Sequence, residues 1–139
     1  MTTVYRTESE IEEVVKGLEL CTTAKDLFPH SSHLTVAVWY LRNAEFPVAT
    51  EKMRNALRRF LRHHGVNEEK YNETLTMFWL RMVEQALREA EDSVVGSTNA
   101  ILESLGNSSL VLEYYSKERL WSEEARLAWL GPDLKALPE

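Results

Sequence analysis

Apolar residues recur along most of the chain with the 3.6-residue period of an α-helix. The clearest case covers residues 47–64, where a stripe of apolar side chains lies apart from a face rich in arginine. Its members are Ala49, Met53, Ala56, Leu57, Phe60 and Leu61. Pro47 suits the first turn of this helix, because its missing N–H would have no partner there. Gly65 suits the C-terminal cap that follows His63 and His64, so we predict a helix over 47–64.

The stretch 28–41 holds the most continuous apolar run in the chain. We predict a helix over 31–44 whose apolar side chains surround most of its circumference. A helix of that kind is a central one, since a surface helix keeps one polar face. His30 and His33 stand at its beginning, one helical turn apart, so both imidazoles can project from the same face.

The same period predicts helices on both sides of these two. Thr7 and Glu10 have the spacing of a capping box, which predicts a helix over 8–20. The longest stripe predicts a helix over 68–92, and Gly96 to Thr98 interrupts the pattern beyond it. Shorter helices are predicted at about 98–105, 109–115 and 116–129.

No stretch of useful length shows the two-residue alternation of a half-buried strand. We therefore predict an all-α fold, a compact single-domain helical bundle over residues 1–139. It should contain about six or seven helices, with three long ones at the centre.

Composition and charge narrow the class of partner. The net charge of −6 argues against nucleic-acid binding, although basic residues gather on the predicted helix over 47–64. They are Lys52, Arg54, Arg58, Arg59 and Arg62. The single cysteine, Cys21, rules out an internal disulfide. No apolar run approaches the roughly 20 residues of a membrane span, and the N-terminus lacks the layout of a secretion signal, so we expect a cytoplasmic protein without membrane contact.

The polar residues near the helix over 31–44 support a first hypothesis, a small-molecule or metal-binding domain. His30 and His33, with a third nitrogen or oxygen ligand, could hold Zn²⁺ or Fe²⁺. Asn72 lies beside the apolar stripe of the helix over 68–92 and is the position expected near them, while Glu73 is a better ligand that projects away. Arg54, at the margin of its own stripe, could clamp a carboxylate or phosphate.

The second hypothesis is a non-catalytic structural or protein-interaction domain. His30 would then cap its helix or lie exposed, and His33 would be buried and bonded to Asn72 or Thr76. An outer face would bind a partner or a second copy, giving a homo-oligomer. The candidates for that face are Leu87, Trp121 and Trp129. No nucleophile elbow, zinc-protease motif or glycine-rich phosphate loop occurs, so the sequence predicts no particular reaction.

Three segments in order resemble a family of small bacterial helical proteins. Residues 28–37 match an aromatic residue followed by a His-x-x-His-Leu-x-x-Ala helix entry. Residues 71–79 match a His-Glu-Thr-x-Thr-x-x-Trp segment, except that Asn72 stands where the pattern has histidine. Residues 129–138 match a Pro-Asp-Leu-x-x-Leu-Pro end. The resemblance implies a shared helical fold and no activity, because none is established for the family.

Overall fold

The computed structural model describes residues 4–90 and 93–138, and all regular secondary structure within them is helical, as predicted. The five longer helices are α1 (Glu8–Glu19), α2 (His30–Asn43), α3 (Phe46–His63), α4 (Glu73–Leu87) and α5 (Val94–Leu105). Two short α-helices follow, α6 (Lys117–Leu120) and α7 (Glu123–Leu127). Three 3₁₀ helices are η1 (Lys25–Leu27), η2 (Glu68–Lys70) and η3 (Ser108–Glu113). In the described residues, no helix has the length and apolar character to cross a membrane.

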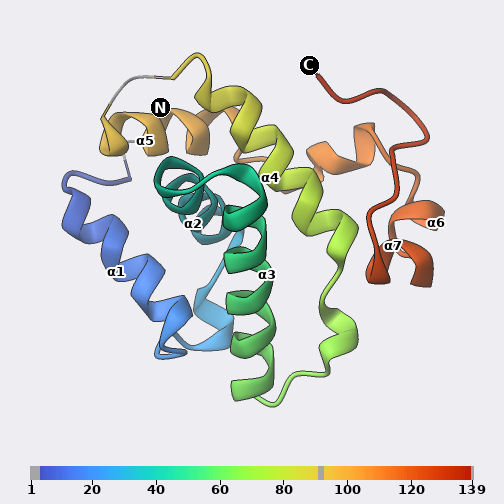
Figure 1. Ribbon diagram of the computed structural model, residues 1–139, viewed down its shortest axis with the longest axis horizontal. Coiled ribbons are helices and arrows are strands. Elements are labelled where there is room, and N and C mark those ends of the chain that lie inside the picture. Colours follow the sequence, from blue (N-terminus) through green and yellow to red (C-terminus); the bar gives the residue numbers. More distant parts are fainter. Residues whose placement is uncertain (1–3, 91–92, 139) are drawn as a thin grey trace.

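The predicted central position of α2 is confirmed. Figure 1 shows α2 almost end-on, with α1, α3, α4 and α5 around it, and it packs against all four. Leu34, Val36 and Val38 are completely buried, and Val36 leaves the helix on the side nearly opposite Leu34 and Val38. A helix enclosed in this way holds its beginning in a fixed position relative to α3 and α4, which is where the candidate site lies.

Helix ends in the first half of the chain follow their predicted signals. The Thr7 hydroxyl accepts from the Glu10 N–H at 3.2 Å, and the Glu10 carboxylate accepts from the Thr7 N–H at 3.0 Å, which completes the capping box. Pro47 lies in the first turn of α3. Gly65 adopts a φ of +69° just after the helix ends, a conformation that glycine reaches without steric cost.

The prediction of one helix over 68–92 was wrong at both ends. Residues 68–70 form the separate helix η2, and α4 begins only at Glu73. The reason is Asn72, whose Oδ1 accepts from the Leu75 N–H at 2.9 Å and so caps α4. The helix ends at Leu87. The last two predicted residues, 91 and 92, lie outside the described residues.

The predicted boundaries after α4 were also wrong. Helix α5 begins at Val94 rather than near 98, because the Ser93 hydroxyl accepts from the Gly96 N–H at 2.9 Å and places Gly96 in the first turn. The predicted helix over 109–115 is the 3₁₀ helix η3. The predicted helix over 116–129 is divided into α6 and α7, since the Ser122 hydroxyl accepts from the Ala125 N–H at 3.1 Å and starts a new helix.

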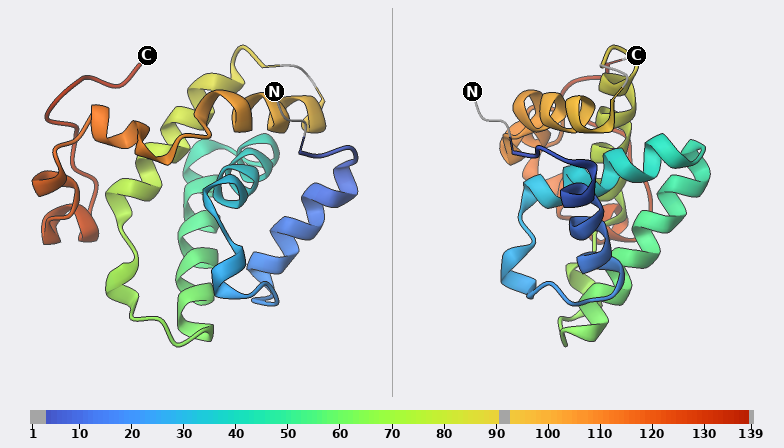
Figure 2. Two further views of the ribbon diagram at one scale, coloured as in Figure 1. Left: turned by 180° about the vertical axis from the view of Figure 1, so that it is seen from behind. Right: turned by 90° about the vertical axis from the view of Figure 1, so that its left-hand side faces the viewer.

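Both ends of the described chain are fastened to distant helices. The first residues lie beside α5 (Figure 2), where the Tyr5 N–H donates to Asn99 Oδ1 at 3.1 Å. At the other end, residues 128–137 run back past α6 and α7 (Figure 1). The Thr74 hydroxyl, completely buried on α4, donates to the Ala128 carbonyl at 2.7 Å and accepts from the Leu130 N–H at 3.0 Å. The C-terminal segment is therefore part of the folded unit.

Candidate functional site

A half-open groove of about 710 Å³ lies beside the beginning of α2. Its walls come from α2, α3, α4, the segment 65–72 and η3, and they are mostly apolar. The main wall residues are Phe28, Met53, Leu57, Phe60, Leu75, Trp79, Val111 and Leu112. The volume lies within the roughly 300–1,000 Å³ of pockets that hold small organic molecules. His30, His33 and Asn72 line the same groove.

His33 is a neutral imidazole in the wall of the groove. Its Nδ1 lies 3.1 Å from the Pro29 carbonyl, and its ring meets the Phe28 ring edge-on at 4.6 Å. Burial lowers the pKa of His33 to about 4, although the hydrogen bond to Pro29 acts in the opposite direction. Because a carbonyl oxygen can only accept, Nδ1 carries the proton of the neutral ring. The second nitrogen, Nε2, is therefore a hydrogen-bond acceptor at neutral pH.

His30 joins three helices. Its Nε2 lies 3.0 Å from the Leu105 carbonyl at the end of α5, and its ring packs edge-on against Trp79 of α4 at 4.4 Å. The carbonyl again requires the proton on the bonded nitrogen. The alternative in which His33 bonds to Asn72 or Thr76 was wrong about the partner, since each imidazole donates to a backbone carbonyl instead.

Asn72 lies in the groove wall, but its amide is used by the fold. Oδ1 caps α4, and Nδ2 donates to the Leu120 carbonyl at 2.9 Å, joining α4 to α6. The side chain is buried, with 8% of its surface exposed. Both polar atoms of the Asn72 side chain are thus bonded within the protein, whereas His30 and His33 each bond to the described residues through only one ring nitrogen.

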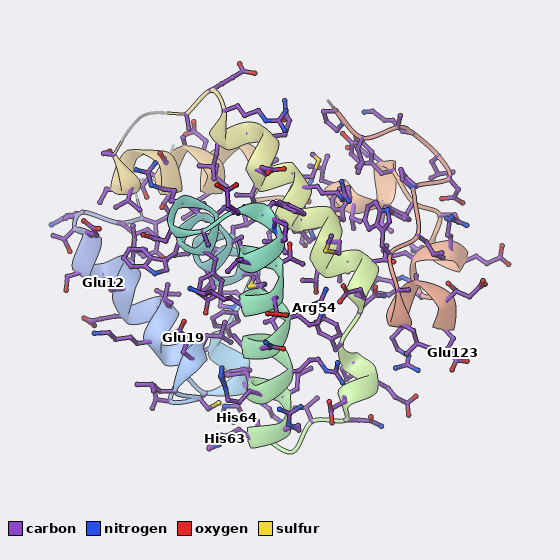
Figure 3. The ribbon with its side chains drawn as sticks, viewed as in Figure 1. Glu12, Glu19, Arg54, His63, His64 and Glu123 are labelled. Atoms are coloured by element: carbon purple, nitrogen blue, oxygen red, sulfur yellow. The ribbon has the colours of Figure 1, made fainter. Side chains whose placement is uncertain are left out.

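Arg54 and Glu73 form a pair outside the groove. Arg54 extends from the side of α3 that faces the beginning of α4 (Figure 3), and it contacts Glu73 through two bonds, Nε to Oε1 at 3.0 Å and Nη2 to Oε2 at 2.6 Å. The Tyr71 hydroxyl donates to the same carboxylate at 2.7 Å. Burial alone would raise the pKa of Glu73, but the bonds from Arg54 and Tyr71 outweigh it and hold that pKa below its ordinary value.

The basic residues of α3 have acidic neighbours. Arg58 and Arg62 each place a guanidinium nitrogen 3.3 Å from Glu68 Oε1 on η2. Together with the Arg54–Glu73 pair, these contacts set a carboxylate beside three of the five basic residues singled out in the sequence. A phosphate backbone at this face would have to compete with those carboxylates.

The five predicted site residues are thus divided between two places. His30, His33 and Asn72 line the groove, whereas Arg54 and Glu73 bind each other beside a separate surface pocket. Within residues 4–90 and 93–138, no three or more His, Cys, Asp or Glu side chains are grouped so that they could hold a metal ion. Glu73 therefore does not supply the third ligand that the metal hypothesis required.

Sequence reasoning missed most of the groove wall. Ser108, Ser109 and Trp121 line it from the C-terminal part of the chain, and Lys25 and Lys70 stand exposed at its mouth. Periodicity marks Leu57 and Leu75 as apolar, but it does not show that they border a groove rather than a filled core. The sequence did offer a sign for two wall residues. Phe28 and Trp79 stand close in sequence to His33 and Asn72, which were predicted as site residues.

Comparison of the chain with family models, with curated proteins and with solved structures finds no match. The family resemblance of its three motifs remains a prediction, and the geometry of the groove is the observation that bears on function.

Proposed function

We propose that this protein binds a small, largely apolar organic molecule in the groove, with the polar group of that molecule at the beginning of α2. The observation that carries the proposal is a mostly apolar groove of about 710 Å³ with two imidazoles in its wall. Apolar contact would provide most of the affinity, at about 25 cal/mol for each Å² removed from water. The few polar groups would fix the orientation of the ligand.

The charges around the groove favour a ligand whose buried part is uncharged. The lowered pKa of His33 keeps that imidazole neutral at pH 7. The charged lining residues Lys25, Asp26 and Lys70 are all exposed. A charge buried without a partner is costly, so a charged substituent of the ligand belongs at the mouth of the groove, in water.

A metal ion could bind in the groove together with the organic molecule, without replacing it as the ligand. His30 and His33 each have one ring nitrogen that does not bond to a backbone carbonyl. Zn²⁺ or Fe²⁺ held by those two nitrogens would need its remaining ligands from water or from the bound molecule. Titrations repeated with added ZnSO₄ and with EDTA show whether a metal takes part.

The test is titration with 1-naphthol, a two-ring apolar probe, followed by calorimetry. Thr76 is half-buried and lines the groove from α4, so Thr76→Trp should fill part of the space. We expect this variant to bind 1-naphthol at least about tenfold more weakly than the wild type, a change of 1.4 kcal/mol. Gln85→Trp places the same side chain on α4 away from the groove and should leave the affinity unchanged.

Wild-type protein that fails to bind 1-naphthol, or Thr76→Trp protein that binds it equally well, would contradict the proposal. Nuclear magnetic resonance of the labelled wild type gives a second measurement that needs no variant. The indole signal of Trp79 should shift on addition of the probe, while backbone signals of α1, which does not line the groove, should not.

A further inference from the structure

Several polar atoms in the groove wall are bonded to the protein itself. The Asn72 amide uses Oδ1 and Nδ2 on Leu75 and Leu120, and the Thr76 hydroxyl donates to the Asn72 carbonyl at 3.0 Å. His30 donates through Nε2 to Leu105. These bonds occupy the Asn72 amide and the Thr76 hydroxyl, whereas His33 keeps a ring nitrogen that bonds to no part of the chain that the structure describes.

Nε2 of His33 is an acceptor that the fold does not use. Nδ1 turns back to the Pro29 carbonyl at the beginning of its own helix, so Nε2 lies on the far side of the ring, away from that carbonyl. No residue among those described donates a hydrogen bond to Nε2, and that atom is not sealed from solvent. The ring itself belongs to the groove wall, beside Phe28.

We infer that the groove selects molecules that combine an aromatic ring system with an O–H or N–H donor, and that this donor bonds to Nε2 of His33. The inference rests on the proposed function and adds the chemical class of the ligand. Phe28, Phe60 and Trp79 provide ring faces and edges on which a flat ring can pack. Phenol-like and indole-like molecules have both features.

An acceptor that the bound ligand covers discriminates between two ligands that differ only in the donor. 1-Naphthol has the O–H, and 1-methoxynaphthalene has the same two rings with the proton replaced by a methyl group. A ligand without the donor leaves Nε2 desolvated and unbonded, which is the costly outcome. We expect wild-type protein to bind 1-naphthol about threefold to tenfold more tightly than 1-methoxynaphthalene, the range of one neutral hydrogen bond.

Two substitutions of His33 distinguish the role of Nδ1, which bonds to Pro29, from the role of Nε2, which would bond to the ligand. His33→Asn can still donate to the Pro29 carbonyl but has no atom at the place of Nε2, so its preference for 1-naphthol should disappear. His33→Gln reaches the place of Nε2 with an amide oxygen and should keep part of the preference. His63→Asn changes an exposed histidine at the end of α3, outside the groove (Figure 3), and should leave the ratio as in the wild type.

The outcomes distinguish this inference from the proposed function. Equal binding of both probes to wild-type protein, or a preference that survives in His33→Asn, overturns the inference and leaves the proposed function standing. Binding of neither probe overturns both. In the wild type, the ¹⁵N resonance of His33 Nε2 should shift with 1-naphthol and not with 1-methoxynaphthalene, a readout that does not depend on the folding of a variant.

Discussion

Burial determines the charge of His33, and through it the stability of the protein in mild acid. The pKa of His33 falls from an ordinary 6.5 to about 4 in the folded state. Between those two pH values, the unfolded chain takes up a proton on this imidazole that the folded chain does not. The free energy of unfolding therefore decreases as the pH falls through this window, and His33 has no such effect above it.

We predict that urea unfolding of the wild type shows this loss between pH 6.5 and pH 4, on the order of 3 kcal/mol in total. His33→Asn, which has no titrating ring, should show a smaller dependence over the same window. His30, His63 and His64 are present in both proteins, so the difference between the two curves isolates His33. Parallel curves would mean that the imidazole charges freely in the folded state.

The sequence predicted which histidines share a place, but not what they bond to. The three-residue spacing of His30 and His33 put both at one helix end, and both do line one groove. The partner of His30 is the carbonyl of Leu105, far away along the chain. Every residue has a backbone carbonyl, so the types of side chain in the sequence do not indicate which carbonyl accepts the bond.

At the scale of the elements, the beginning of α4 depends on one residue, Asn72. Asn72 caps the helix through Oδ1 and holds the Leu120 carbonyl of α6 through Nδ2. The two bonds have different requirements, since the cap needs an acceptor and the link to α6 needs a donor. Aspartate provides the first and not the second, which makes the two roles separable.

We predict that Asn72→Ala lowers the free energy of unfolding by about 2 kcal/mol, about half from the cap and half from the orphaned Leu120 carbonyl. Asn72→Asp should keep the cap and still lose stability, because its carboxylate faces that carbonyl. The control is Asn67→Ala, which removes an exposed cap from the short helix η2 and should cost less. Thermal and urea unfolding measure all three. An Asn72→Asp protein as stable as the wild type would show that the bond to α6 contributes nothing.

Side-chain caps of the same kind explain three of the wrong helix boundaries. Asn72, Ser93 and Ser122 each stand within or beside a stretch of helical periodicity, and each side chain accepts a bond from a backbone N–H three residues later. Apolar spacing continues smoothly through Asn72 and Ser122, so it favours one long helix there, whereas Gly96 to Thr98 interrupt the spacing just after Ser93 and delay the predicted start. Only the position of the neighbouring elements decides whether a serine or asparagine starts a helix or lies within it.

For the molecule as a whole, Thr74 ties the C-terminal segment to the helical core. Its hydroxyl bonds to both Ala128 and Leu130 from a completely buried position. The guanidinium of Arg81, also on α4, lies 4.7 Å from the centre of the Trp129 ring. The spacing of apolar residues gives no sign that a threonine on α4 holds this segment.

We predict that Thr74→Val, which has the same shape without the hydroxyl, lowers the free energy of unfolding by about 2 kcal/mol and increases hydrogen exchange in residues 128–137. The matched control is Thr98→Val. Thr98 is equally buried, but its hydroxyl donates to the Val94 carbonyl of its own helix, so the change should cost much less and leave exchange in the tail unaltered. Equal effects of the two substitutions would contradict the role of Thr74.

The enclosure of α2 also has a consequence for how the protein is made. A ribosome finishes α2 early, whereas α5, one of the helices that cover it, is synthesised roughly 3–10 s later at ordinary rates of translation. During that interval α2, the central helix of the fold, has an uncovered apolar side. A nascent chain that pauses between α4 and α5 is therefore the form of this protein most open to aggregation and to capture by chaperones.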